Sequence, residues 1–287
     1  MPESMSGDQE QKEPLCEGDP VVFVDTRRRE LYGVLKAGQK SGIRGDLVAH
    51  DEVLGRPSGC RVMSRKRRPF RVFRATLQQH VLNMQRHATI VYPKDIGPLL
   101  VHADIFPGAR VVEGGFGSGA LSMALLRAIG ADGELITYEW REESANRAGK
   151  NVAALLGETP NHVVRLGDIT EAIEETEVDR VVLDIPEPWR VLAHAADALK
   201  DGGILAAYVP TVIQVQRLMQ AFREKPVFYM SWCIETLERF WHVTPESCRP
   251  HQQMVGHTGF YCFARRSARE FDRYPPREAP GDAAATD

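Results

Sequence analysis

Residues 111–126 read VVEGGFGSGALSMALL, a short run of β-branched residues that enters a cluster of glycines and then an apolar helical pattern. Glycine lets a backbone turn tightly and approach a ligand without interference from a Cβ atom. In open α/β sheets, ligands bind just outside the carboxyl ends of the strands. The stretch therefore predicts a strand, a ligand-binding loop and a helix, which together begin an α/β domain.

Strands alternating with helices are expected from residue 98 onward. Candidate strands, each expected to precede a helix, span 110–113, 134–139, 162–167, 179–185 and 203–209. This alternation predicts a parallel sheet with helices on both faces. Two further apolar runs, near 228–233 and 258–265, have no long helix between them, so the sheet should end in an antiparallel pair.

The chain before residue 98 is organised differently. Short apolar runs alternate with turn-forming sequences over residues 15–75, which predicts a small N-terminal β domain. Residues 76–97 hold a short helical pattern at 76–84 and the tetrapeptide YPKD at 92–95, and are expected to form a basic hinge. An α/β domain should follow at 98–266. The polar ends, 1–14 and 267–287, hold too few apolar residues to fold and are expected to be disordered.

Composition excludes several classes of protein. The hydrophobic share of 43% and the charged share of 26% are typical of globular proteins. The longest weakly charged apolar stretch, 204–216, contains a proline and is too short to cross a bilayer, and no signal-peptide pattern opens the chain. The five cysteines are scattered without a CxxC pair, which favours a cytoplasmic protein with free thiols and no metal site.

The glycine loop narrows the choice of cofactor to a dinucleotide or S-adenosylmethionine, because no lysine follows it as in a P-loop. Gly115, Gly117 and Gly119 read GxGxG, whereas the third glycine of the dinucleotide fingerprint would fall at Ala120. Glu113 directly precedes the glycines, and its charge suits the ammonium group of methionine better than a pyrophosphate. Spacing and charge therefore favour S-adenosylmethionine.

Acidic residues also end the next two candidate strands. Glu139 is placed to accept hydrogen bonds from both hydroxyls of a ribose, a role that either cofactor would require. Asp168 is placed to accept one from an adenine amino group. The alternative for Asp168 is the N-cap of a helix at 169–175, and the residues leave both interpretations open.

The fourth candidate strand runs into DRVVLDIPEPW at 179–189, which places Asp184 at the same edge of the sheet. Pro186 and Pro188 stiffen the loop. A stiffly held carboxylate suits methyl transfer to a ring nitrogen, where positioning dominates and the ring becomes cationic. The alternative is a helix that begins at Pro188, with Glu187 or Asp184 as its cap and Trp189 packed in the core.

Together these motifs resemble the tRNA (adenine-N1)-methyltransferases that modify adenine 58 in the T loop. The resemblance rests on EGGFGSGAL, Glu139, GD at 167–168, DIPEPW and YPKD, together with IFPGARV at 105–111, RP at 249–250 and GHTGF at 256–260. It covers about residues 18–266. It implies a Rossmann-like class I methyltransferase fold with a seven-stranded sheet, S-adenosylmethionine as cofactor, tRNA as substrate and a homotetramer.

The resemblance also implies roles for single residues. Asp184 corresponds to the essential carboxylate at the cofactor, and Tyr92 to an aromatic residue near the target base, where a ring can stack on a flipped nucleotide. A tyrosine packed in a hinge is the alternative. Candidate cofactor ligands are the loop residues Gly115, Gly117, Ser118, Gly119, Ala120 and Leu121, the acids Glu113, Glu139, Asp168 and Asp184, and Ser144 in the helix after the second strand.

Two loop residues depart from the family pattern. Gly114 stands where the family usually has alanine, and Phe116 stands where it has a small residue. A phenylalanine here either crowds the methionine part of the cofactor or packs away from it.

Charge is unevenly distributed along the chain. Residues 53–94 contain ten Lys and Arg and no Asp or Glu, so the formal net charge of −3 combines +10 here with −13 elsewhere. Such segregation is typical of proteins that bind a phosphate backbone, whereas the alternative is a solvated basic face or a salt-bridged subunit surface. Candidate RNA-binding residues are Arg65, Lys66, Arg67, Arg68, Arg86 and Lys94.

The leading hypothesis is thus S-adenosylmethionine-dependent methylation of N1 of adenine 58 in tRNA. A methyltransferase acting on protein carboxylates would leave DIPEPW and the basic segment without a use. A dinucleotide-dependent oxidoreductase is disfavoured by the glycine spacing. A catalytically inactive RNA-binding subunit of the same fold is the remaining alternative.

Overall fold

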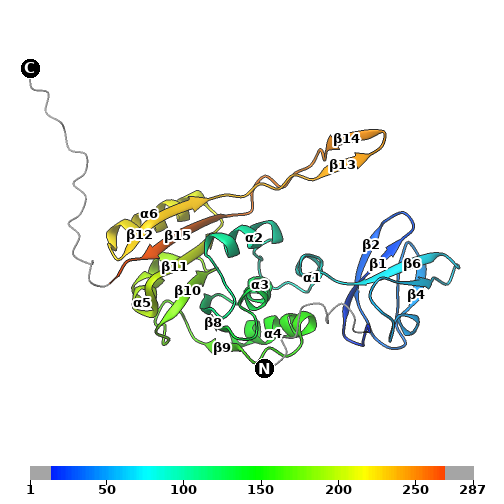
Figure 1. Ribbon diagram of the computed structural model, residues 1–287, viewed down its shortest axis with the longest axis horizontal. Coiled ribbons are helices and arrows are strands. Elements are labelled where there is room, and N and C mark those ends of the chain that lie inside the picture. Colours follow the sequence, from blue (N-terminus) through cyan, green and yellow to red (C-terminus); the bar gives the residue numbers. More distant parts are fainter. Residues whose placement is uncertain (1–13, 269–287) are drawn as a thin grey trace, which may run out of the picture. The chain divides into compact units, whose positions relative to one another are not determined.

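The computed structural model describes residues 14–268 (Figure 1). The ends expected to be disordered, 1–14 and 267–287, therefore lie outside the described residues except at their inner edges. There, Pro14 forms a β-bridge with Pro57, and the backbone N–H of Ser267 donates a hydrogen bond to the carbonyl of Val227. The described residues form two compact units, one of residues 14–93, 118–124 and 146–159, the other of residues 94–117, 125–145 and 160–268.

The first unit contains the predicted small β structure. An antiparallel sheet has the order β2-β1-β6-β5, and β3 pairs with β4 in a separate ribbon. The strands are β1 (Pro20–Asp25), β2 (Glu30–Val34), β3 (Lys40–Ile43), β4 (Asp46–Ala49), β5 (Cys60–Met63) and β6 (Pro69–Arg74), with the 3₁₀ helix η1 (His50–Glu52) after β4. Phe23, Phe70 and Val72 are among the side chains buried in one core, so alternate residues of the strands face inward.

The predicted helix near residue 76 is also present, as α1 (Leu77–Asn83). The Thr76 hydroxyl accepts a hydrogen bond from the backbone N–H of Gln79, and the Gln79 side chain accepts one from the backbone N–H of Thr76. This capping box satisfies two backbone donors at the start of the helix and fixes where it begins.

The second unit is built on a seven-stranded sheet with the order β12-β15-β11-β10-β7-β8-β9. Its strands are β7 (Arg110–Gly114), β8 (Glu134–Glu139), β9 (His162–Leu166), β10 (Val178–Leu183), β11 (Leu199–Val209), β12 (Phe228–Ile234) and β15 (Phe260–Arg266). Strands β7 to β11 are parallel, and β15 runs antiparallel to both β11 and β12. The predicted parallel sheet with an antiparallel end is therefore confirmed.

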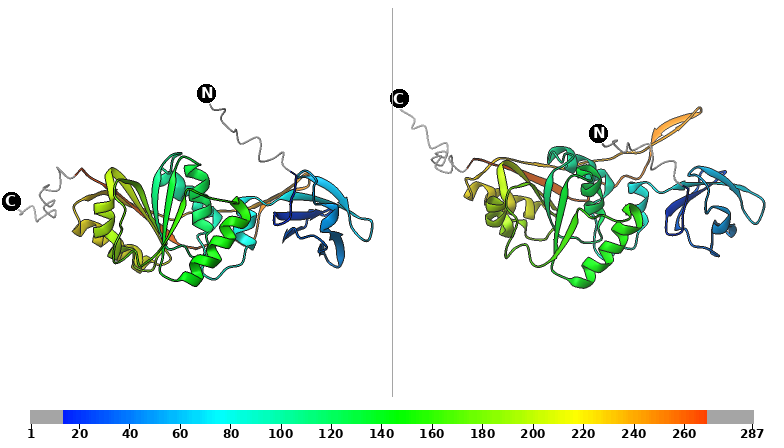
Figure 2. Two further views of the ribbon diagram at one scale, coloured as in Figure 1. Left: turned by 90° about the horizontal axis from the view of Figure 1, so that it is seen from below. Right: turned by 60° about the horizontal axis from the view of Figure 1, so that its bottom comes forward.

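Helices lie on both faces of this sheet (Figures 1 and 2). Side chains of α5 (Leu192–Ala198) and α6 (Val212–Glu224) share one buried cluster with alternate residues of β10 and β11. On the other face, His102 at the end of α2 (Pro93–His102) contacts the ring of Phe263, with 5.6 Å between ring centroids. The helices α3 (Ala120–Ile129) and α4 (Glu142–Leu156) contribute residues to both units.

The strand order reverses between β7 and β10. From β7 the chain proceeds to β8 and β9 on one side, and then crosses to β10 on the other side of β7. In open α/β sheets, such a reversal places the ligand-binding crevice at the carboxyl ends of the two strands between which it occurs. This is the position that the glycine loop and DIPEPW occupy.

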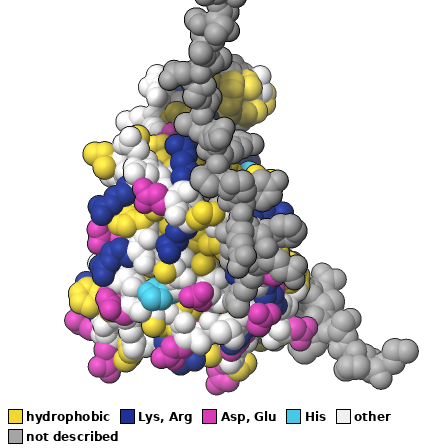
Figure 3. Space-filling view, turned by 90° about the vertical axis from the view of Figure 1, so that its left-hand side faces the viewer, with side chains coloured by type: hydrophobic (Ala, Val, Ile, Leu, Met, Phe, Trp, Pro, Cys, Tyr) yellow, Lys and Arg dark blue, Asp and Glu magenta, His cyan; other side chains and the backbone are white. Residues whose placement is uncertain are grey.

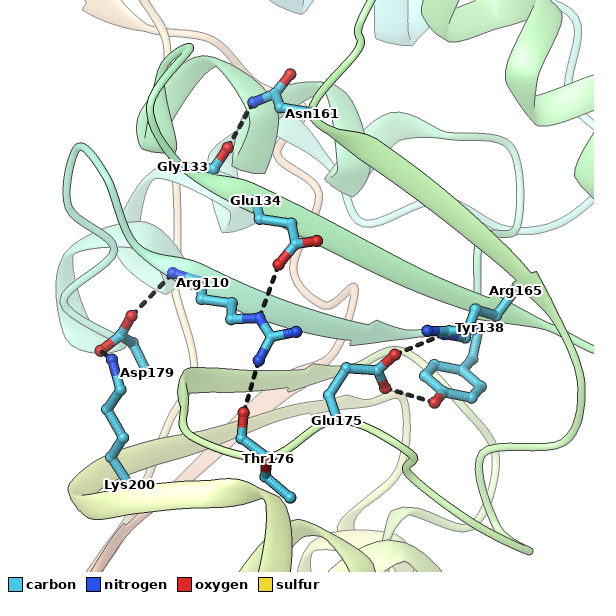
Figure 4. Close-up of polar contacts among 10 residues, drawn as sticks. All are labelled: Arg110, Gly133, Glu134, Tyr138, Asn161, Arg165, Glu175, Thr176, Asp179 and Lys200. Carbon is cyan, nitrogen blue, oxygen red and sulfur yellow. Dashed lines mark hydrogen bonds and ion pairs between the residues drawn. The ribbon is translucent and has the colours of Figure 1, made fainter.

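The helix expected after the third strand is absent, and residues 169–177 follow a turn and an irregular path instead. The buried Glu175 carboxylate accepts hydrogen bonds from the Tyr138 hydroxyl and from Nε of Arg165, each at 2.5 Å (Figure 4). The backbone N–H of Glu174 donates to the same tyrosine oxygen at 2.9 Å. These long-range bonds outweigh the local helical pattern that the sequence suggested.

Hydrogen bonds and ion pairs also connect Arg110, at the start of β7, with the end of the irregular segment 169–177 (Figure 4). The guanidinium of Arg110 donates to the Glu134 carboxylate at 2.7 Å and to the carbonyl of Thr176 at 2.6 Å. Asp179 accepts hydrogen bonds from the Arg110 backbone N–H and from Nζ of Lys200, both at 2.8 Å. Arg110 thereby joins the end of the irregular segment, at Thr176, to a network of bonds that spans β7, β8, β10 and β11.

A β-hairpin that the sequence did not predict lies between β12 and β15. Its strands, β13 (Trp241–Thr244) and β14 (Ser247–Pro250), pair only with each other among the described residues and extend away from the large sheet (Figure 1). The RP motif lies at the end of β14. Large apolar side chains on and beside the hairpin are exposed to solvent: Leu237, Phe240, Trp241, Val243, Met254 and Val255.

We expect Tyr138→Phe to lower the free energy of unfolding by about 1–3 kcal/mol, because it leaves the buried Glu175 carboxylate and the Glu174 N–H without their shared partner. Urea unfolding monitored by circular dichroism measures this change. The control is Tyr229→Phe, since Tyr229 is 58% exposed. Equal stability of the two variants would show that this bond does not hold the segment.

Candidate active site

The glycine loop and the end of β10 meet at the point where the strand order reverses. The backbone N–H of Asp184 donates to the carbonyl of Gly114 at 2.8 Å. Gly115 has a φ of +92°, and a Cβ atom at this residue would lie 2.4 Å from the carbonyl oxygen of Asp184. Only glycine fits both the backbone conformation and the space, so this residue sets how closely the two loops approach.

Asp184 is surrounded by protein although its side chain keeps partial exposure. Burial raises the pKa of the Asp184 carboxyl to about 7. Within residues 14–268, no group donates a hydrogen bond to this carboxylate that would offset the effect. A perturbed carboxyl group in a crevice is a candidate for chemistry.

The loop after Asp184 is fixed by a hydrogen bond from α6 and by the short helix that follows it. The carbonyl of Pro186 accepts a hydrogen bond from the Gln214 side chain of α6 at 2.9 Å. Pro188 begins the 3₁₀ helix η2 (Pro188–Val191), and Trp189 packs against the core, as the structural alternative expected. Glu187 occupies the N-cap position, but its side chain makes no capping bond, so the capping role in that alternative is wrong.

Glu113 and Glu139 lie at the carboxyl-end half of β7 and β8, which are neighbours in the sheet. Both are buried, with 0% and 4% of their surface exposed. The Thr137 hydroxyl donates to Glu113 Oε2 at 2.8 Å, and the backbone N–H of Arg141 donates to Glu139 Oε1 at 3.1 Å. Two carboxylates are thus fixed on neighbouring strands beside the loop that begins at Gly115.

Phe116 does not point into open space. It is 3% exposed, and its ring meets the ring of His162 edge to face, with 5.3 Å between centroids. The ring of Phe116 therefore packs on a partner within the protein.

The remaining loop residues lead into α3. Gly117 and Gly119 complete the glycine turn, and Ala120 and Leu121 are buried in the first turn of the helix. The hydroxyl of Ser118 accepts hydrogen bonds from the backbone N–H groups of His87 and Ala88 at 3.2 and 3.4 Å. Its side chain is thus engaged with protein.

Asp168 follows β9, and the backbone N–H of the adjacent Gly167 donates to the carbonyl of Glu139 at 3.1 Å. The exposed Asp168 carboxylate accepts a hydrogen bond from the backbone N–H of Thr170 at 2.8 Å, which lowers its pKa. No helix begins here, so the N-cap interpretation is wrong and the bond is that of a turn. Ser144 lies in the first turn of α4 with a partly exposed side chain.

Lys94 is not a surface charge. Its side chain is 7% exposed, and Nζ lies 2.6 Å from Asp95 Oδ1 and 2.8 Å from the carbonyl of Thr236. The hydroxyl of Thr258 donates to the other oxygen of Asp95 at 2.6 Å. Placing Lys94 among RNA-binding residues is therefore corrected, because the acid next in sequence neutralises it. The pair bonds α2 to the segments that precede and follow the hairpin β13–β14.

The other basic candidates are exposed in the first unit. Arg65, Lys66, Arg67 and Arg68 form the turn between β5 and β6, where Arg68 approaches Asp46 at 3.9 Å. Arg86 is also exposed, and its guanidinium lies 6.0 Å from the centre of the Tyr92 ring. Tyr92 itself is partly exposed.

Sequence patterns did not identify Thr137, His162, Asp95 or Thr258 as site residues. The first two occupy strand positions where any β-branched or aromatic residue would fit the pattern. Asp95 lies within the YPKD motif and Thr258 within GHTGF, so both belong to motifs of the resemblance, but these motifs did not predict what the two residues do.

These residues suit S-adenosylmethionine. Glu113 and Glu139 supply buried negative charge for an ammonium group and acceptors for a ribose, and the close approach at Gly115 leaves the loop backbone open to a ligand. Within residues 14–268 no three His, Cys, Asp or Glu side chains cluster to hold a metal, and no helix there has the length and apolarity to cross a membrane.

Several known proteins are similar to this chain in sequence and structure. A TrmI tRNA (adenine(58)-N(1))-methyltransferase of Thermus thermophilus is 36% identical over 248 residues, which cover 86% of this chain and 96% of that protein. A SAM-dependent O-methyltransferase structure from Thermotoga maritima has a TM-score of 0.84 at 31% identity, covering 92% of this chain and 97% of that one. For the tRNA (m1A58) methyltransferase TrmI of Aquifex aeolicus the TM-score is 0.77 at 27% identity, covering 89% and 99%.

The α/β unit therefore has the class I fold of S-adenosylmethionine-dependent methyltransferases that the resemblance implied. A family described as the tRNA methyltransferase complex GCD14 subunit matches residues 70–248. This match spans more than half of the chain, and the chain belongs to that family.

Proposed function

We propose that the protein methylates N1 of adenine 58 in the T loop of tRNA, with S-adenosylmethionine as methyl donor. The observation that carries this proposal is Asp184, a desolvated carboxyl group with a pKa of about 7 beside the glycine loop. The relatives named for this activity align with most of the chain.

S-adenosylmethionine supplies the methyl group as an electrophile on a sulfonium. We assign Glu113 to its ammonium group, Glu139 to its ribose and Asp168 to its adenine, with Ser144 and residues 115–121 along its length. The ionised Asp184 would accept a hydrogen bond from the exocyclic amine of the target adenine. This bond raises electron density at N1 and stabilises the positive charge that the ring gains.

The alternatives fit the site less well. A dinucleotide would bring a pyrophosphate beside two buried carboxylates, which repel it. Burial of the Asp184 carboxyl group destabilises its charged form. A catalytically inactive RNA-binding subunit would have no use for such a group. The Thermotoga maritima protein is named as an O-methyltransferase, but an oxygen substrate would leave the exposed basic surface of the first unit unexplained.

The tRNA backbone would bind the basic face of the first unit. Besides the turn at 65–68, Arg61 and Arg71 lie directly opposite each other on β5 and β6, both exposed. Like charges in this register destabilise a sheet unless an anion neutralises them. Phe73, two residues beyond Arg71 and 41% exposed, offers a ring for stacking. Tyr92 would stack on the flipped adenine.

Positive and negative side chains are mixed on one face of the second unit. Figure 3 shows Lys and Arg interspersed with Asp and Glu on the face at the left of Figure 1. Such a face has no field of one sign to attract a polyanion, which supports the first unit as the RNA-binding part.

We also propose a cytoplasmic homotetramer. Six large apolar side chains are exposed on and beside the hairpin. Single exposed apolar residues are common on protein surfaces, whereas a group of them favours burial in an interface, here between copies of the chain. Light scattering should give a mass near four times 32.1 kDa. A mass of one chain at micromolar concentration would contradict the assembly.

The decisive experiment for function uses tRNA made without modifications. The protein and S-adenosylmethionine should convert adenine 58 to 1-methyladenine, as mapped by nuclease digestion and mass spectrometry. The matched control is the same tRNA with guanine at position 58, which should not be methylated. Methyl groups at another atom or on the control would contradict the proposal.

Asp184→Asn should lose more than about 100-fold in methyl transfer while becoming more stable than the wild type at pH 8. The carboxyl pKa rises from 3.8 to about 7 on folding, so the wild type loses stability as the pH rises from 4 to 7. Asparagine avoids this loss, which is on the order of 1–3 kcal/mol. Urea unfolding at pH 4 and pH 8 measures it. A variant less stable than the wild type at pH 8 would contradict the desolvation.

Reversing the charge of Arg65 and Lys66 to Glu should weaken tRNA binding and reduce the slope of log Kd against log salt by about 2. Filter binding across a salt series measures both. The matched control reverses Arg27 and Arg28, which lie in the turn between β1 and β2 and change the net charge equally. Identical slopes for the two double variants would rule out a specific role for the basic turn.

A further inference from the structure

A buried hydrogen-bonded chain ends on Glu113. His162 Nε2 lies 2.9 Å from the hydroxyl oxygen of Thr137, and this hydroxyl lies 2.8 Å from Glu113 Oε2. Thr137 and Glu113 have no exposed surface. The three residues come from the neighbouring strands β9, β8 and β7, so the chain crosses the sheet just beneath the glycine loop.

The direction of these bonds follows from counting protons. A threonine hydroxyl has one proton, and a carboxylate can only accept. Thr137 therefore donates to Glu113, and His162 must donate its Nε2 proton to Thr137. Burial lowers the pKa of His162 to about 4, so the ring is neutral at neutral pH and carries its proton on Nε2. Each donor thus favours a negative charge on Glu113.

The same histidine supports the glycine loop. Its ring packs edge to face with Phe116 at an interplanar angle of 87°. Phe116 lies between Gly115 and Gly117, so a change at His162 reaches the loop backbone as well as the Glu113 carboxylate. Two independent contacts of one residue converge on the region that the methionine part of the cofactor would occupy.

We propose that Thr137 and His162 are positioning residues that hold the Glu113 carboxylate for the ammonium group of S-adenosylmethionine, an inference that rests on the proposed function. Without the threonine hydroxyl, the buried carboxylate would lose a charge-assisted hydrogen bond and its fixed orientation. The effect should be confined to ligands that possess the ammonium group.

Two ligands separate this role from general support of the fold. S-adenosylhomocysteine contains the amino-acid part, whereas 5′-methylthioadenosine has the same nucleoside without an ammonium group. Thr137→Val removes the hydroxyl with little change of shape and should weaken binding of S-adenosylhomocysteine about tenfold or more. Its affinity for 5′-methylthioadenosine should stay within about twofold. Isothermal titration calorimetry on the full-length protein measures both without requiring tRNA.

Matched variants test each link. Thr137→Ser keeps the hydroxyl and should bind both ligands as the wild type does. His162→Phe keeps a ring against Phe116 but loses the Nε2 donor, so it should reduce affinity for S-adenosylhomocysteine more than for 5′-methylthioadenosine.

Two results would overturn the inference. Equal losses for both ligands in Thr137→Val would indicate a structural role, and unchanged affinity for both would show that the hydroxyl does not act on Glu113. Either result leaves the proposed function standing if the wild type methylates adenine 58. Ligand-selective loss without methylation of tRNA would instead place the error in the proposed substrate.

Discussion

The contact between the backbones of Gly115 and Asp184 governs this site. A Cβ atom at residue 115 would lie 2.4 Å from the Asp184 carbonyl, so the ends of β7 and β10 approach as closely as two chains without an intervening side chain can. The protein packed around Asp184 raises the pKa of its carboxyl group to about 7. The same contact keeps the glycine loop open at the crevice where the strand order reverses. This backbone contact thereby places the ligand loop beside the carboxyl group whose pKa is raised.

Buried acids on neighbouring strands give this edge of the sheet its chemical character. Glu113 and Glu139 are fixed by hydrogen bonds from Thr137 and from the Arg141 backbone. Negative charge held in this way favours a ligand with ammonium and sulfonium groups over one with a pyrophosphate. The exposed arginines and lysine at residues 61–71 have the opposite sign, which suits the polyanionic tRNA that we propose as substrate.

Local pattern was sufficient for most of the fold. The β-branched runs and their helical separators predicted all seven strands of the large sheet, and Thr76 marked the start of α1. The helix expected at 169–175 failed because Glu175 bonds to Tyr138 and Arg165, residues remote in sequence. The hairpin β13–β14 was missed because its apolar side chains face solvent, contrary to the usual alternation of buried and exposed residues.

The site could be predicted where chemistry and motif coincide, as for Asp184 and the glycine loop. The sequence could not predict the role of a residue where that role depends on which other residue its side chain contacts. A charge count treats Lys94 as a free cation, yet the buried Asp95 neutralises it. Thr137 and His162 are ordinary strand residues in sequence, and only their distances reveal a chain of donors that ends on Glu113.

The central claim is that an ionised, desolvated Asp184 assists methyl transfer. Its most direct test is the pH dependence of the transfer rate at limiting concentrations of both substrates, which reports on the free enzyme. The rate should rise with pH through a midpoint near 7, the value at which burial places the Asp184 carboxyl. A rate that stays constant between pH 5 and pH 8 would contradict the claim.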